Sequence, residues 1–230
     1  MENLPETLGG QKIDNMLSTI VWQQNYEVKI GRGDDITRRE WACYTDGSKV
    51  GAKAGSGSVI LHWDRIYKHV SFSVGNSEVF QAEVSAILAT AQSLVEQGIQ
   101  DADLDFLVDS QAALKALSNP VTTSDLVRSA KASLNLVGTK NNLILHYIRA
   151  LRGWEYNELA DRNANYGRDL VVLPENVPSP SRCHFYSVME GMIEKEWVKA
   201  WGKGPYRESK YFINRPSSVG ALLLLQNTRE

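Results

Sequence analysis

The chain has 230 residues, 43% of them hydrophobic, and a formal net charge of −2 at pH 7, so it can bury one good core and perhaps an appendage. Its two cysteines, Cys43 and Cys183, exclude a disulfide framework and a zinc pattern, which favours an intracellular, reducing compartment. The longest apolar run, residues 219–225, is too short to cross a bilayer, so we expect a soluble protein with no membrane partner.

The elements predicted along the chain alternate between strands and helices after a polar leader. Residues 1–38 carry glycines and mixed charges around one short apolar patch, and no chemistry is assigned to them. Apolar residues at helical spacing between Phe80 and Val95 predict a long helix that ends at Gly98. Strands are expected at about 41–46, 56–63, 67–74, 103–108 and 143–151, and helices at about 78–97, 110–117, 124–137 and in the segment that carries Asp161.

The connections between these elements predict how the strands are ordered. Short turns join the first three strands, which favours an antiparallel meander. The long helix then returns the chain across the sheet, so the fourth strand should lie parallel to the first. Asp46 and Asp109 would therefore lie at the carboxyl ends of neighbouring parallel strands, where open α/β sheets bind their ligands. Gly51, Gly55 and Gly57 are read as turn and strand glycines, because no helix follows them as a dinucleotide-binding loop would require.

Four acids occur where a carboxylate is unfavourable or conspicuous: Asp46, Glu83, Asp109 and Asp161. Glu83 falls on the apolar stripe of the long helix, and the aspartates at positions 46 and 109 each close an apolar run. A strand-end aspartate on its own is more often a turn former or a helix cap. Several buried acids that converge, however, need cations to offset their repulsion, and oxygen ligands without histidine or cysteine favour Mg²⁺ or, as a substitute, Mn²⁺.

The residues around these acids carry a family resemblance over about residues 40–170. The segments are Thr45-Asp46-Gly47-Ser48, Gln81-Ala82-Glu83, Val108-Asp109-Ser110-Gln111 and Asn157-Glu158-Leu159-Ala160-Asp161. In this order they resemble a ribonuclease H domain, and more narrowly the ribonuclease H region of non-LTR retrotransposon polyproteins. The resemblance implies an α/β ribonuclease H-like fold, with a five-stranded mixed sheet in the order βββαβαβα and helices on both faces. We expect a leader at 1–38, the catalytic domain at 39–172, and a linker with a basic and aromatic tail at 173–230.

The resemblance also implies an activity, which is hydrolysis of the RNA strand of an RNA/DNA hybrid by two metal ions. Asp46 and Asp109 would contact both ions, Glu83 would hold one and touch a ribose 2′-hydroxyl, and Asp161 would complete the other site. Two such ions can activate a water and stabilise the leaving oxygen. Plausible substrate contacts are the neighbours Gly47, Ser48, Ser110 and Gln111, although turn and cap roles remain equally open for each of them.

One position departs from the family pattern, because Leu151 stands where a histidine two residues before Gly153 is usual. His146 should face the opposite way on the same strand, so it is a poor substitute. The departure favours an alternative function, in which the chain is a catalytically weak or inactive subunit that acts as an RNA-binding or structural part of a ribonucleoprotein. A proofreading-type exonuclease is disfavoured, because that class usually has an acid where this chain has Ser48.

The tail mixes cations with aromatic side chains, which suits the backbone and bases of a nucleic acid. A helix is expected at 190–201, and the alternative that the tail only packs on the core remains open. Partners in a polyprotein or a ribonucleoprotein are left unidentified. The cations and aromatics in question are Lys203, Arg207, Lys210, Arg215, Trp201, Tyr206, Tyr211 and Phe212.

Overall fold

The structure is a computed structural model that describes residues 13–14, 19–20, 23–31, 39–149 and 155–203. The chain divides into two compact units, Met1–Arg182 and Cys183–Glu230. Helix α5 (Arg182–Lys203) begins at the last residue of the first unit and otherwise makes up the described part of the second. It confirms the helix expected at 190–201 and begins earlier. The domain boundaries expected near residues 38 and 172 stay predictions.

A six-stranded mixed sheet forms the centre of the first unit, in the order β2-β8-β6-β3-β4-β5. The meander β3-β4-β5 is antiparallel, whereas β6 pairs parallel to β3, and β8 pairs parallel to β6 and to β2. The strands are β2 (Glu27–Lys29), β3 (Trp41–Val50), β4 (Lys53–His62), β5 (Arg65–Gly75), β6 (Asp103–Val108) and β8 (Asn142–Tyr147). The five strands expected from the sequence are present, and the antiparallel meander and the parallel fourth strand are confirmed. The sheet has six strands rather than the expected five, because β2 adds to its edge.

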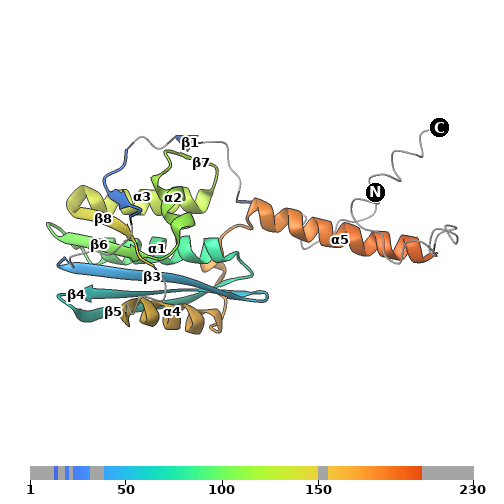
Figure 1. Ribbon diagram of the computed structural model, residues 1–230, viewed down its shortest axis with the longest axis horizontal. Helices are drawn as coiled ribbons and strands as arrows, with labels where there is room; N and C mark the ends of the chain where they lie inside the picture. Colours follow the sequence, from blue (N-terminus) through green and yellow to red (C-terminus); the bar gives the residue numbers. More distant parts are fainter. Residues whose placement is uncertain (1–12, 15–18, 21–22, 32–38, 150–154, 204–230) are drawn as a thin grey trace. The chain divides into compact units, whose positions relative to one another are not determined.

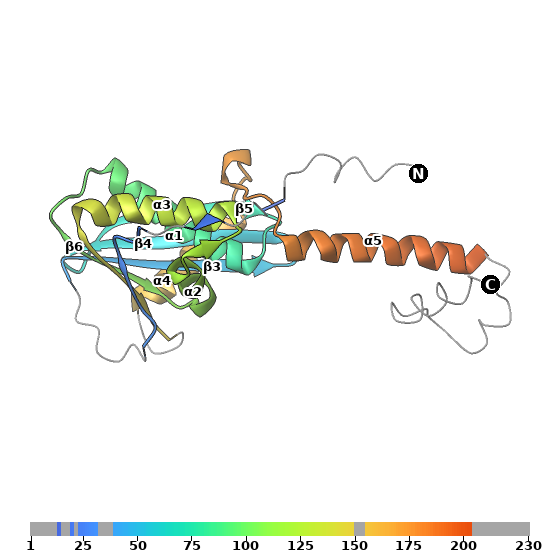
Figure 2. The ribbon, with the colours of Figure 1, turned by 90° about the horizontal axis from the view of Figure 1, so that it is seen from above.

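Helices cover both faces of this sheet (Figure 1). Helix α1 packs between the sheet and α3, and α4 covers β3, β4 and β5 on the opposite face. In the view from above, α1 and α3 run side by side along the sheet (Figure 2). The helices are α1 (Val79–Glu96), α2 (Gln111–Ser118), α3 (Asp125–Lys140) and α4 (Glu155–Arg168). The expected order βββαβαβα is therefore present from β3 to α4, with two helices, α2 and α3, and the short β7 between the last two strands.

The two faces of the sheet bury separate apolar clusters. The larger cluster lies under α1, α2 and α3 and includes Phe106, Ile87 and Leu134. The smaller one lies under α4 and includes Tyr44 and Leu107. Consecutive residues of β3 and β6 enter opposite clusters, so both central strands are buried on both faces, as parallel strands covered by helices should be. Strand β3 runs on to Val50 rather than ending at residue 46 as expected, so Asp46 lies within it, just past the pair Thr45–Val108 where the parallel ladder with β6 ends. Asp109 follows the end of β6, and the buried sheet therefore holds both acids rigidly at the same level.

The leader contributes structure that its sequence does not predict. Residues 27–29 form β2, which extends the sheet beyond β8, and β1 (Thr19–Ile20) pairs with β7 (Val121–Thr122). Tyr26 is buried, and its hydroxyl donates to the Leu117 carbonyl over 3.0 Å. Strands of two or three residues are too short to show a periodic pattern, which is why the sequence does not reveal them.

The last strand is shorter than expected, because it ends at Tyr147 rather than near residue 151. Its partner β6 ends at Val108, and Val108 pairs with Tyr147, so the ladder has no further partner there. Leu151 and Gly153 lie outside the described residues, as do the tail positions 204–230. No helix in the described part of the chain is long and apolar enough to cross a membrane.

Candidate metal centre

The first two acids are brought together by a close approach between β3 and α1. A Cβ atom added at Gly47 would lie 2.5 Å from the Glu83 backbone nitrogen and 2.8 Å from the Ala82 carbonyl carbon. No real side chain tolerates such contacts, so glycine allows β3 to run directly against the first turns of the helix. Asp46 and Glu83 consequently lie side by side. The Gly47 backbone N–H also donates toward both carboxyls, which offsets only part of the rise in pKa that burial causes in each.

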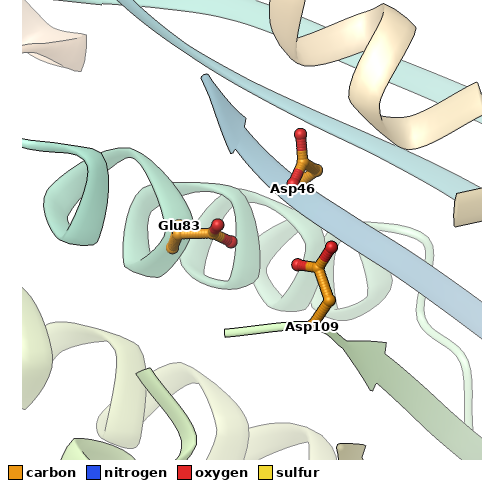
Figure 3. A group of neighbouring side chains, drawn as sticks. All are labelled: Asp46, Glu83 and Asp109. Atoms are coloured by element: carbon orange, nitrogen blue, oxygen red, sulfur yellow. The ribbon is translucent and has the colours of Figure 1, made fainter. Parts of the chain in front are cut away.

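Asp109 completes a group of three acids. It follows the end of β6, which pairs parallel with β3, so its carboxylate reaches the same sheet edge as Asp46. Each of the three residues offers a carboxylate oxygen, and these oxygens all lie within 4.8 Å of one another. Figure 3 shows the side chains converging from β3, from α1 and from the end of β6. The convergence expected from the strand order is therefore present.

Burial and mutual repulsion make the ionised forms of these acids unfavourable. Asp46 is only 8% exposed and Glu83 only 6%. Burial, and after it the negative charges of Asp109 and Asp161, raise the pKa of Asp46 from 3.8 to about 7. Burial and the neighbouring aspartates raise the pKa of Glu83 well above its usual range, and burial raises that of Asp109. An opposite charge would reverse this effect.

No such charge comes from the described part of the chain, where none of these three acids pairs with lysine, arginine or histidine. The Oε2 atom of Glu83 is buried and accepts no hydrogen bond from any described residue. A second buried acid, Asp105 on β6, shows the contrast. Its carboxylate accepts from Arg39 over 2.8 Å and lies 3.1 Å from His146, and both contacts lower its pKa.

The three unpaired acids fit a divalent cation. They supply only hard oxygen donors, which Mg²⁺ and similar ions prefer, and one of these oxygens, Oε2 of Glu83, is buried without a partner among the described residues. A bound cation would also favour the ionised form of each carboxyl, offsetting the repulsion described above. The group is therefore compatible with divalent metal binding.

Asp161 approaches from the opposite face of the sheet, on α4. It is exposed and lies outside the group of three, but its charge raises the pKa of both Asp46 and Asp109, and its side chain contacts that of Asp46. Two glycines bring the helix this close. Gly57 pairs with Asp46 across β3 and β4, and an added Cβ there would lie 2.1 Å from the Ala164 nitrogen. Gly55 approaches the Arg168 nitrogen equally closely.

The four predicted substrate contacts lie around this group. Gly47 and Ser48 continue β3 beyond Asp46, and both are half-buried. The Ser110 hydroxyl accepts from the Ala113 backbone over 3.3 Å and caps α2, while Gln111 is exposed in the first turn of that helix. Ser110 thus has the cap role left open from the sequence, and contacts with substrate stay a prediction for all four.

Two residues near the acids were not predicted as part of the site. Asn157 is buried, and its Nδ2 donates to the Asp109 carboxylate over 3.2 Å, while its Oδ1 has no partner among the described residues. Asn165 donates to Asp161 over 3.0 Å. Asn165 could have been predicted from the sequence, because it lies four residues after Asp161 and residues four apart on a helix share a face. His146, in contrast, contacts Asp105 and none of these acids.

Solved ribonuclease H structures resemble this chain, whereas no protein-family model and no curated protein matches it. Ribonuclease H1 from the halophilic archaeon Halobacterium salinarum is 28% identical, with a TM-score of 0.46, over 56% of this chain and 97% of that one. The N-terminal ribonuclease H domain of a Mycobacterium tuberculosis protein is 19% identical, with a TM-score of 0.47, over 57% and 95%. LC11-RNase H1 in complex with an RNA/DNA hybrid is 22% identical, with a TM-score of 0.48, over 56% and 96%. The strand order and helix placement described above are those of the ribonuclease H-like fold.

Proposed function

We propose that this chain is a metal-dependent endonuclease that hydrolyses the RNA strand of RNA/DNA hybrids, and that it derives from a retroelement. The observation that supports the proposal is the group formed by Asp46, Glu83 and Asp109, whose carboxylate oxygens lie within 4.8 Å of one another and have no cationic side chain as partner in the described part of the chain. Such groups are costly to bury unless a cation binds them. The order and neighbours of the four acids, which resemble those of ribonuclease H, support the hybrid as substrate.

The four acids would have distinct tasks. Asp46 and Asp109 would hold both of two Mg²⁺ ions, Glu83 would use its free Oε2 on one of them, and Asp161 would complete the other site. When bound, the ions would activate a water and stabilise the leaving oxygen. Glu83 would also accept from a ribose 2′-hydroxyl, the group that distinguishes RNA from DNA. Asn157 would keep the Asp109 carboxylate oriented through its 3.2 Å hydrogen bond.

Cleavage of a labelled hybrid tests the proposal. We expect the protein to cut the RNA strand of an RNA/DNA hybrid only when Mg²⁺ or Mn²⁺ is added, and to leave a DNA duplex of the same sequence intact. Asp46→Asn and Asp109→Asn should abolish cleavage. Glu158→Gln is the matched control, since it neutralises an exposed acid on α4 and should cut as the wild type does. Cleavage by either asparagine variant at the wild-type rate would refute the metal assignment.

A binding measurement on the same hybrid separates the alternative function. A protein that binds the hybrid tightly with Mg²⁺ present, yet leaves it uncut at every enzyme concentration, would be the catalytically weak or inactive RNA-binding subunit. Leu151, in the position of the usual histidine, and the basic and aromatic tail are the sequence features that favour this alternative, whereas the four acids oppose it.

A further inference from the structure

Three polar side chains form a closed set of hydrogen bonds beside Asp161. Nη1 of Arg168 donates to the Ser48 hydroxyl over 2.9 Å and to Oδ1 of Asn165 over 2.8 Å. The Ser48 hydroxyl donates to the same Oδ1 over 2.7 Å. We refer to Ser48, Asn165 and Arg168 as the polar triangle. It joins the end of β3, just beyond Asp46, to the last two turns of α4.

The polar triangle fixes which way the Asn165 amide faces. An arginine has no acceptor, so the atom of Asn165 that meets Nη1 must be the oxygen. The amide nitrogen is thereby turned the other way, where Nδ2 donates to Oδ1 of Asp161 over 3.0 Å. A flipped amide would place its oxygen against a carboxylate and its nitrogen against a guanidinium, and both contacts would be repulsive.

We propose that Asn165 and Arg168 are positioning residues for the metal centre, which hold the Asp161 carboxylate beside Asp46 so that it can serve as a ligand. The proposal rests on the metal-dependent function above, but only on its metal site and not on the hybrid as substrate. Arg168 acts through Asn165 in this arrangement, and Asn165 acts on Asp161.

Asp161 needs such support more than the other acids do. Asp46 and Glu83 are buried, so packing confines them, whereas Asp161 is exposed and projects from a helix surface. The charges of Asp46 and Asp109 also repel it. A hydrogen bond from an oriented amide offsets that repulsion, and partners of this kind behind a metal ligand typically change metal affinity by about 10- to 100-fold.

The backbone around the polar triangle explains how it is reached from α4. Ser48 pairs with Gly55 across β3 and β4, and an added Cβ at Gly55 would lie 2.1 Å from the Arg168 nitrogen. The helix therefore rests on the glycine that faces Ser48, and the Arg168 side chain has only a short distance to span. That side chain is 19% exposed, and its charged contact among the described residues is a long one, 3.9 Å to Asp169.

Titration of the metal-free protein with Mn²⁺ tests the proposal, with calorimetry for affinity and stoichiometry. Asn165→Ala should weaken Mn²⁺ binding by about 10-fold or remove one of two sites, and Arg168→Gln should act in the same direction. The matched control is Asn163→Ala. Asn163 also holds α4 on the sheet, through a 2.9 Å hydrogen bond to the Ser58 carbonyl, but it does not contact Asp161. The Asn163→Ala substitution should lower thermal stability and leave the Mn²⁺ affinity unchanged.

A double-mutant cycle makes the test decisive. If Asn165 acts through Asp161, then Asn165→Ala should weaken Mn²⁺ binding no further once Asp161→Asn is present. In cleavage assays the Asn165→Ala variant should need more Mg²⁺ and should recover its rate at saturating Mg²⁺. Additive effects in the cycle, an unchanged Mn²⁺ affinity for Asn165→Ala, or an equal loss with Asn163→Ala would each overturn the proposal. Mn²⁺ binding with this pattern but no hybrid cleavage would refute the proposed function alone.

Discussion

Asp46→Asn should stabilise the metal-free protein, and more so at high pH. The pKa of Asp46 is about 7 in the folded protein and 3.8 without its environment. The folded state thus binds a proton more tightly than the unfolded state, and raising the pH from about 4 to 7 destabilises the wild type. Three pKa units at about 1.4 kcal/mol each correspond to about 4 kcal/mol, of which about 3 kcal/mol falls above pH 5. An asparagine carries no such penalty.

Urea unfolding in EDTA at pH 5 and pH 8 measures this effect. We expect the stability of Asp46→Asn, relative to the wild type, to increase by up to about 3 kcal/mol between the two pH values. For a chain of this size that is a relative increase in Tm of roughly 6 to 12 °C. Saturating Mg²⁺ or Mn²⁺ should remove the advantage, because a bound cation favours the ionised wild-type carboxyl.

Asp105→Asn is the control with the opposite sign. Burial opposes the charge of Asp105 as well, but hydrogen bonds and charges from His146 and Arg39 outweigh it and lower its pKa. Its ionised form therefore stabilises the fold at neutral pH, and this contribution is lost as the pH falls through the folded pKa. Asp105→Asn should destabilise the protein at pH 8 by about 3 kcal/mol, because it leaves Arg39 without its buried partner. If Asp46→Asn were equally destabilising at both pH values, the acid would be a satisfied structural cap and the reasoning would fail.

Three further predictions concern packing, turnover and the tail. Gly57→Ala should destabilise the protein by about 2 kcal/mol or more and abolish hybrid cleavage, because its Cβ would lie 2.1 Å from the α4 backbone; unfolding and cleavage assays measure both effects. Leu151→His should speed multiple-turnover cleavage by about 10²-fold at unchanged hybrid affinity, since an imidazole could shuttle a proton; a slower and less stable variant would show that the leucine packs instead. Deletion of residues 181–230 should weaken hybrid binding and flatten its salt dependence, whereas an unchanged salt slope would show that the tail makes no phosphate contacts.

Much of the fold could be predicted because its signals are local. Helical spacing of apolar residues identifies α1, and the structure buries most of that stripe, including Glu83. The short turns of the meander and the crossover through α1 then leave few possible strand orders. Asp46 and Asp109 could be placed at one sheet edge for this reason, without any knowledge of side-chain geometry.

The contacts that refine the site could not be predicted in the same way. The orientation of the Asn165 amide depends on Arg168 and Ser48, and Ser48 is 117 residues away from Asn165 in the chain. The sequence identifies Gly55 and Gly57 as strand glycines, but it does not show that they let α4 pack directly against β4. That close approach depends on the distance between the two backbones. Such information appears only once two elements pack together, because no periodicity in either segment encodes it.

Comparison with Asp105 indicates that the group of three acids has a functional rather than a structural role. The same sheet contains Asp105, a buried acid that pairs with Arg39 and His146. A buried acid with a structural role is thus provided with cationic or hydrogen-bonding partners in this fold. At the sheet edge it instead places Asp46, Glu83 and Asp109 together, and Gly47 brings β3 close enough to α1 for this. One oxygen of Glu83 has no hydrogen-bond partner among the described residues. The group places buried acids together without cationic partners among the described residues, while the residues around it form an ordinary packed core. Natural proteins show such local departures from stability at functional sites. A bound cation would relieve the mutual repulsion of these acids, so we expect the stability of this domain to depend on divalent metal and on pH through the same three carboxyls.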